Sequence, residues 1–155
     1  MALSLEAAAT VVVVTDRRLA VAAWESLFRA QHEVLGQLAA DFDGDGLTEA
    51  EYDVLLTVTR GEGNSVRLRD VTANMLISQP SVSRLVDRMV SCGLVAKCPD
   101  PQDGRGAIVT ATEAGVAAFR RVAAVHARSI AERMAVLTDD ELRELLALTA
   151  KLRDA

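Results

Sequence analysis

The stretch that begins at Ser78 restricts the fold of this chain more than any other. From there to Gly93 the apolar residues recur at helical spacing, and glycine is a favoured residue just beyond a helix. The pattern then changes, because residues 94–98 and 107–111 have the character of strands and the polar, glycine-bearing segment 99–106 that of a turn. A helix followed directly by a β-hairpin predicts the second helix and the wing of a winged helix-turn-helix.

Amphipathic helices are predicted on both sides of this middle region. Residues 17–40 and the segments after Thr48, Thr112 and Thr138 carry apolar side chains mostly at steps of three and four. Thr48 and Thr138 are each followed three residues later by glutamate, which is the spacing of a capping box. The apolar faces are larger than so small a module can cover, so we expect them to be buried against a second copy of the chain.

These patterns predict a mainly α-helical fold with a small β-hairpin wing. The chain has 155 residues, the size of one domain, and its 50% apolar content with 3% aromatic residues argues against disorder and against an all-β sandwich. We expect a winged helix-turn-helix domain at residues 61–111, a helical dimerisation region at 17–60 and 112–155, and a loosely held leader at 1–16.

Charge is unevenly distributed along the chain. The net charge is −5, which excludes a polycation of the histone type. Residues 67–106 nevertheless carry six cations against four anions, whereas the rest of the chain carries 11 cations and 18 anions. A local excess of positive charge is what a phosphate-binding surface requires, so the pattern favours double-stranded DNA as a partner.

The helix after Ser78 has one apolar and one polar face. The apolar side chains are those of Val82, Leu85, Val86 and Met89, and the polar candidates for DNA contact are Gln79, Ser81, Ser83, Arg84 and Arg88. Glutamine and arginine can read purine edges and serine can reach phosphate, so we expect this face to meet the major groove. The competing interpretation is an ordinary solvated amphipathic helix.

A single cation, Arg105, stands between two glycines at the tip of the predicted hairpin. A β-arm can place such a side chain in the minor groove of DNA, where the narrow cleft concentrates negative potential. Asp103 is two residues earlier and is placed to orient the guanidinium, while Arg67, Arg69 and Thr72 are candidates for holding the DNA backbone. The competing interpretation is an ordinary exposed turn.

Four segments carry a recognisable combination of motifs. They are residues 47–56 (LTEAEYDVLL), 78–89 (SQPSVSRLVDRM) with 93–95, 100–106 (DPQDGRG) and 112–115 (TEAG). Together they resemble the MarR family of bacterial transcription regulators, from about residue 20 to the end of the chain. The resemblance implies a ligand-responsive repressor that binds a pseudo-palindromic operator as a homodimer. Gly104 departs from the family pattern, in which two successive arginines often stand in the wing.

The resemblance also implies an effector pocket between the dimerisation helices and the winged module, open to a small aromatic or anionic molecule. Its candidate lining residues are Trp24, Phe28, Arg29, His32, Tyr52 and Asp53, with Arg29 or His32 pairing an acid. The competing interpretation is that Trp24 and Phe28, at helical spacing, belong to the core. Relatives that respond to urate carry a tryptophan on an extra N-terminal helix, which residues 1–16 lack, so urate is not implied.

Two other functions remain open at this stage. Cys92 and Cys98 flank the passage from the predicted helix into the wing, so their oxidation would disturb DNA binding in a thiol-sensing regulator. The winged module would alternatively bind a protein partner and ignore DNA. In that case the loss of Arg105 would leave the affinity for nucleic acid unchanged.

The sequence offers little support for catalysis, metal binding or membrane contact. It contains no Ser/His/Asp cluster, no phosphate-cradling loop and no metal-ligand spacing, so we expect neither an enzyme nor a cofactor. The acidic run 41–46 resembles a calcium loop, but its twelfth position is Tyr52 instead of the required glutamate, which favours an acidic interhelical loop. Two cysteines and an apolar run at 7–14 too short to span a bilayer favour a cytoplasmic protein.

Overall fold

The structure is a computed structural model that describes residues 16–154 apart from 43, 45 and 76–78. The chain divides into two compact units after Gly36. The first unit holds most of helix α1 (Arg17–Leu38), and the second holds the remaining elements. Nearly all of the leader predicted at 1–16 lies outside the described residues.

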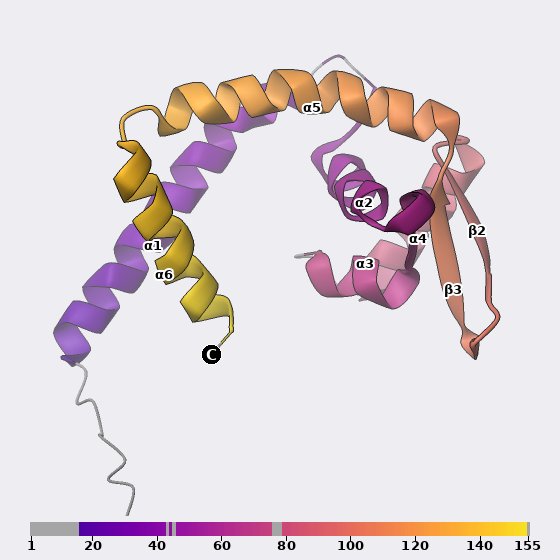
Figure 1. Ribbon diagram of the computed structural model, residues 1–155, viewed down its shortest axis with the longest axis horizontal. Coiled ribbons are helices and arrows are strands. Elements are labelled where there is room, and N and C mark those ends of the chain that lie inside the picture. Colours follow the sequence, from indigo (N-terminus) through magenta and orange to yellow (C-terminus); the bar gives the residue numbers. More distant parts are fainter. Residues whose placement is uncertain (1–15, 43, 45, 76–78, 155) are drawn as a thin grey trace, which may run out of the picture. The chain divides into compact units, whose positions relative to one another are not determined.

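Helices make up most of the second unit, as the sequence predicts (Figure 1). In chain order they are the 3-10 turn η1 (Ala39–Phe42), α2 (Glu49–Arg60), the 3-10 turn η2 (Glu62–Asn64), α3 (Leu68–Asn74), α4 (Gln79–Ser91), α5 (Glu113–Met134) and α6 (Asp139–Arg153). The fold is therefore mainly α-helical with a small β wing, and that prediction is confirmed.

The wing is a three-stranded antiparallel sheet in the order β1-β3-β2, formed by β1 (Ser65–Arg67), β2 (Val95–Asp100) and β3 (Asp103–Ala111). The hairpin of β2 and β3 extends beyond the neighbouring helices α3 and α4 (Figure 1). Strand β1 pairs with the base of β3, where Ser65 faces Thr110 and Arg67 faces Ile108.

One sequence prediction about this sheet was wrong, and one strand was not predicted. Segment 99–106 was expected to be a turn, yet most of it continues the strands and only residues 101–102 connect them. Strand β1 begins at Ser65, where the sequence indicates no strand. Backbone hydrogen bonds hold the hairpin, and residues 101–105 at its tip are all exposed, so polar side chains there give no alternating pattern. Strand β1 has only three residues, all of them half-buried, so it shows no alternation of buried and exposed side chains.

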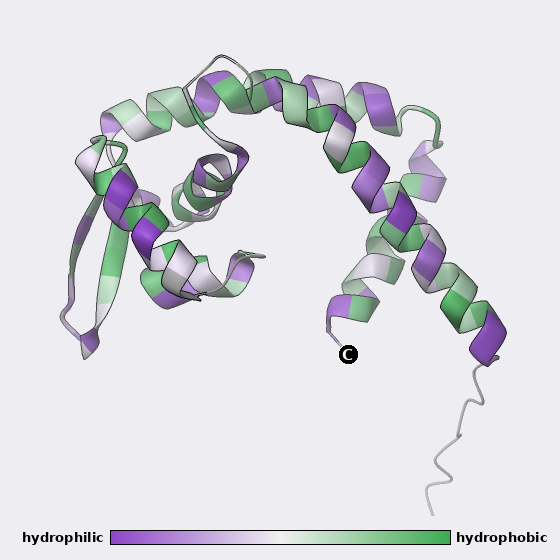
Figure 2. Ribbon diagram, turned by 180° about the vertical axis from the view of Figure 1, so that it is seen from behind, coloured by the Kyte–Doolittle hydropathy of each residue, from purple (hydrophilic) through white to green (hydrophobic). Residues whose placement is uncertain are grey.

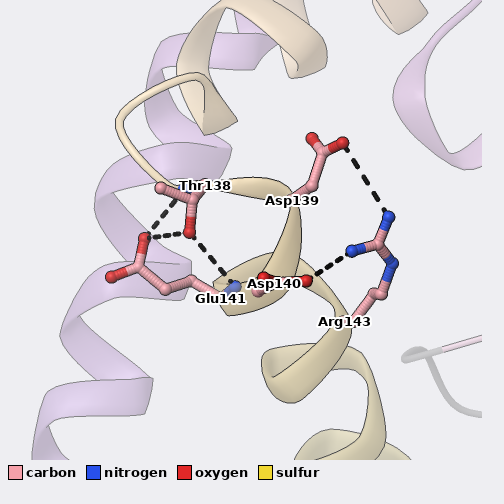
Figure 3. A network of polar contacts seen from close by, with 5 residues as sticks. All are labelled: Thr138, Asp139, Asp140, Glu141 and Arg143. Carbon is pink, nitrogen blue, oxygen red and sulfur yellow. Dashed lines mark hydrogen bonds and ion pairs between the residues drawn. The ribbon is translucent and has the colours of Figure 1, made fainter.

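Threonine side chains cap three helices. The Thr48 hydroxyl accepts the N–H of Glu51 at 3.3 Å, and Glu51 accepts the N–H of Thr48 at 2.9 Å, so the predicted capping box is confirmed. Thr138 and Glu141 form the second predicted box at the start of α6 (Figure 3). Hydrogen bonds from Thr138 lower the pKa of Glu141. Ser78, where the sequence predicts that the helix before the wing begins, lies outside the described residues.

The core of the second unit lies between α2, α3, α4, the first turns of α5 and one face of the sheet. Its largest fully buried side chains are Leu55, Met89, Val54, Val58, Val71, Val82, Val86, Val95, Val109 and Val122. The predicted apolar face of α4 is thus confirmed as part of the core. Burying each of these side chains contributes about 1.5–3 kcal/mol, and it fixes which face of α4 remains outside.

One junction joins α4, the wing and α5. Gly93 follows α4 with φ of 73°, a conformation that side chains disfavour, and the N–H of Leu94 donates to Met89 O at 2.9 Å to close the helix. Thr112 donates its hydroxyl to Gly93 O at 2.7 Å and accepts the N–H of Gly115 at 3.0 Å. This arrangement fixes the wing base against the end of α4.

Large apolar side chains remain exposed outside this core. On α1 they are Leu19, Val21, Trp24, Leu27, Phe28 and Leu35; along α5, α6 and the segment between them they are Val125, Ile130, Val136, Leu145, Leu146, Leu148 and Leu152. Hydrophobic positions recur along α6 (Figure 2). Among the described residues, no helix combines the length and the apolar character needed to cross a bilayer.

Replacing Gly115 by alanine tests the junction. A Cβ atom there would lie 2.0 Å from the backbone oxygen of Leu94, so α5 and the wing base must move apart. We expect a loss of about 2 kcal/mol or more in the free energy of unfolding, measured by denaturant titration. Gly104→Ala is the control, because a Cβ at Gly104 meets no atom within 4 Å. Equal stability of Gly115→Ala and wild type would contradict this packing.

Candidate nucleic-acid interface

A concave surface lies between α3, α4 and the wing. It is lined by Arg67, Leu68, Arg69, Thr72, Ser83, Lys97, Asp100, Asp103, Arg105, Gly106 and Ala107. The structure therefore brings Arg67, Arg69, Thr72, Ser83 and Arg105, which come from three separate parts of the sequence, to one surface. Four cations against two anions line it, which suits a polyanionic ligand.

The polar face of α4 divides into exposed and engaged side chains. Arg84 is exposed, and Ser81 and Ser83 are half-buried. The side chain of Gln79 lies outside the described residues. Arg88 is also exposed, but its Nε lies 3.5 Å from Oε1 of Glu51, so this guanidinium links α4 to the capping box of α2.

The tip of the wing is ordered by two aspartates. Asp103 Oδ1 accepts the backbone N–H of Arg105 at 3.1 Å, so Asp103 acts on the main chain at Arg105, whereas a contact with the guanidinium was expected. Asp100 Oδ1 accepts the N–H of Gln102 at 2.9 Å, and Asp100 Oδ2 lies 2.8 Å from Nε of Arg67. Arg67 is therefore bound within the wing, although its sequence position suggested a contact with DNA.

Ion pairs that sequence reasoning missed connect the parts of this interface. Lys97 on β2 donates to Asp87 on α4 at 2.8 Å, and this contact links the wing to α4. The pair of Arg67 with Asp100 likewise links β1 to β2, and the pair of Arg88 with Glu51 links α4 to α2. Their partners are ten or more residues apart in the sequence, and no local spacing signals them, because the pairing depends on how the hairpin and the helices pack.

The residues proposed for an effector pocket come from both units. In α1, Trp24 and Phe28 have ring centroids 6.1 Å apart and are 63% and 56% exposed, so they are not part of a core within a single chain. Arg29 and His32 are exposed on the same helix. In the second unit Tyr52 is buried, whereas Asp53 is half-buried.

Tyr52 belongs to an aromatic cluster that sequence reasoning did not identify. Its ring lies 5.2 Å from Phe119 and 5.2 Å from His126, and Phe42 lies 5.4 Å from Tyr52, centroid to centroid. Burial raises the pKa of Tyr52, and the charge of Asp53 adds to the effect. Burial also raises the pKa of Asp53.

Asp41 binds this cluster to α5. Its carboxylate lies 2.8 Å from Nδ1 of His126 and accepts the Ser129 hydroxyl at 2.8 Å. Burial favours a higher pKa for Asp41, but hydrogen bonds from His126 and Ser129 outweigh it and lower that pKa below its usual value. The acidic run therefore begins with a residue that anchors η1 on α5.

Asp41→Asn should lower stability in a pH-dependent way. A carboxylate whose pKa is lowered by folding stabilises the protein above its unfolded pKa, about 3.9, and loses this contribution as the pH falls through the folded value. We expect the variant to be about 1–2 kcal/mol less stable at pH 7, by denaturant titration, and the difference to shrink below pH 4. Glu144→Gln, at an exposed position on α6, is the control. A difference that persists unchanged at pH 2 would contradict this account.

Comparisons with known proteins find relatives among transcriptional regulators. The family model described as MarR family matches residues 45–106, which span α2 and most of the winged module. The curated HTH-type transcriptional repressor MdtR of Bacillus subtilis is 24% identical over 77% of this chain and 76% of its own length.

Two solved structures from Streptomyces coelicolor extend the match over nearly the whole chain. AbsC, a MarR family transcriptional regulator, is 26% identical with a TM-score of 0.76, covering 92% of this chain and 98% of AbsC. Sco5413, also a MarR family transcriptional regulator, is 30% identical with a TM-score of 0.67, covering 86% of this chain and 92% of Sco5413. With this fold and this interface, the chain belongs to the MarR family of DNA-binding transcriptional regulators.

Proposed function

We propose that this protein is a ligand-responsive repressor that binds a pseudo-palindromic operator as a homodimer in the cytoplasm. The observation that carries the proposal is the concave surface on which cations of β1, α3 and the wing meet the polar face of α4. The name of the Bacillus subtilis relative, a transcriptional repressor, supports the direction of regulation.

Each part of the surface has a role in this proposal. The exposed Arg84 and the neighbouring Ser83 meet base edges and phosphates in the major groove, together with Gln79 and Ser81. Arg105 enters the minor groove, and Arg69 with Thr72 holds the backbone between them. Arg88 and Arg67 contribute mainly by holding α4 and the wing in place.

The exposed apolar side chains of α1 and α6 support the homodimer. Leu146 is 71% exposed and Leu152 is 66% exposed, although both lie on a helix with hydrophobic positions along its length. A second copy related by a two-fold axis would cover such surfaces. Two recognition helices must then lie about one DNA turn apart, roughly 34 Å, so a small rotation of one protomer weakens binding.

This spacing requirement is the basis of the ligand response. A small aromatic or anionic molecule bound between the dimerisation helices and the winged module would change the separation of the two α4 helices. Trp24, Phe28, Arg29, His32, Tyr52 and Asp53 remain the proposed contacts. Thiol sensing is the second candidate function, because Cys92 and Cys98 are both free and exposed.

Arg105→Ala tests the DNA-binding mode. We expect the Kd for DNA from upstream of the protein's own gene to rise about tenfold and the slope of log K against log salt to fall by about one, measured by fluorescence anisotropy. Arg143→Ala on α6 is the matched control, because its guanidinium pairs with Asp140 and lies outside the interface. Unchanged affinity of Arg105→Ala, with wild type binding this DNA, would contradict the wing contact. Equally weak binding of this DNA and of scrambled DNA by both proteins would favour a protein-interaction module instead.

Leu146→Glu tests the homodimer. The side chain is 71% exposed in one chain, so the substitution should leave the fold of a protomer intact while placing a charge in the proposed interface. We expect sedimentation velocity to give a dimer for wild type and a monomer for the variant at micromolar concentration, with weaker operator binding. Glu144→Gln serves as the control on the same helix. A variant that stays dimeric would exclude this face of α6 from the interface.

A further inference from the structure

A buried carboxylate lies at the far end of the wing, on the surface proposed to face DNA. Only 2% of the Asp100 side chain is exposed, although Asp100 lines the same concave surface as Arg105. An anion at this place repels phosphate, so its presence on a DNA-binding surface needs a physical reason.

The contacts of Asp100 supply that reason. One carboxylate oxygen accepts the N–H of Gln102 in the turn, and the other lies 2.8 Å from Nε of Arg67, the last residue of β1. Arg67 also donates from Nη2 to Oε1 of Gln102. Two guanidinium nitrogens thus bind the turn from the strand on the other side of β3.

The surrounding backbone is arranged around this carboxylate. The register of β2 against β3 shifts between Pro99 and Asp100, and such an irregularity can re-aim a side chain. Gly106 on β3 leaves room beside it, since a Cβ there would lie 3.2 Å from Cβ of Asp100. Strand β1 ends at Arg67, so beyond it the hairpin has only two strands and needs another constraint.

We propose that Asp100 and Arg67 form a strut that positions the wing for DNA, so that Asp100, although it is an anion, raises the affinity for the operator. Asp100 and Arg67 are positioning residues that act through Arg105. A hairpin tip held before binding loses less conformational entropy when Arg105 enters the groove. This inference rests on the proposed role of Arg105 in the minor groove.

The sign of one substitution separates the strut from simple electrostatics. Asp100→Asn removes a negative charge from the DNA-facing surface, which by charge alone strengthens binding. The strut predicts the opposite, a Kd about tenfold higher for the upstream DNA of the protein's own gene, with a lower salt slope, as for Arg105→Ala. Arg67→Lys should weaken binding similarly, because lysine keeps the charge but cannot present two donors in a fork.

Two controls address charge and folding. Asp70→Asn removes an exposed carboxylate of α3, 3.7 Å from Arg69, and is expected to leave affinity unchanged or to raise it. Gln102→Ala removes only the side-chain contact to Arg67 and should give a smaller loss with an intact fold, checked by thermal unfolding. In an Arg105→Ala background, Asp100→Asn should add no further loss.

The outcomes distinguish the inference from the function on which it rests. If Arg105→Ala weakens binding but Asp100→Asn binds as tightly as wild type or more tightly, the strut is refuted and the proposed DNA-binding mode stands. An equal loss from Asp100→Asn with and without Arg105 also refutes it. If Arg105→Ala leaves affinity unchanged, the minor-groove role fails and the strut fails with it.

Discussion

The rest of this structure depends on the hydrogen bonds around Thr112. Its hydroxyl binds the carbonyl oxygen of Gly93, where the recognition helix has just ended, and accepts the N–H of Gly115 in the first turn of α5. One side chain thus joins the end of α4, the base of the wing and the start of the longest helix of the second unit. The absence of a Cβ at Gly115 allows the close approach to Leu94 that this joint requires.

Ion pairs also hold the wing, α4 and α2 in position relative to one another. Lys97 and Asp87 hold β2 against α4, Arg88 binds Glu51 of α2, and the Arg67 guanidinium binds the turn of the wing. Exposed pairs contribute little to stability, typically up to about 1 kcal/mol, but they restrict the orientation of the elements they join. For the proposed interface, which would contact two grooves of DNA at once, this restriction of orientation is the more important effect.

Helix α2 lies between the interface and the aromatic cluster. Glu51 contacts Arg88 of the recognition helix, and the next residue, Tyr52, packs against Phe119 and His126 of α5. A ligand that displaced α2 from α5 would therefore act on an element that also holds α4. Asp41 is bound to His126 and Ser129, so it also holds the chain just before α2 against α5.

The sequence by itself determined the order of the helices, the apolar face of α4, the two capping boxes and the existence of a wing. These features depend on local periodicity and on hydrogen bonds between residues three apart, which a single segment contains. Only the tertiary structure decided that the wing has three strands and that Arg67 binds Asp100. It also decided that Arg88 binds Glu51 and that His126 is the partner of Asp41. These contacts join residues distant in sequence, and their geometry exists only once the hairpin and the helices have packed.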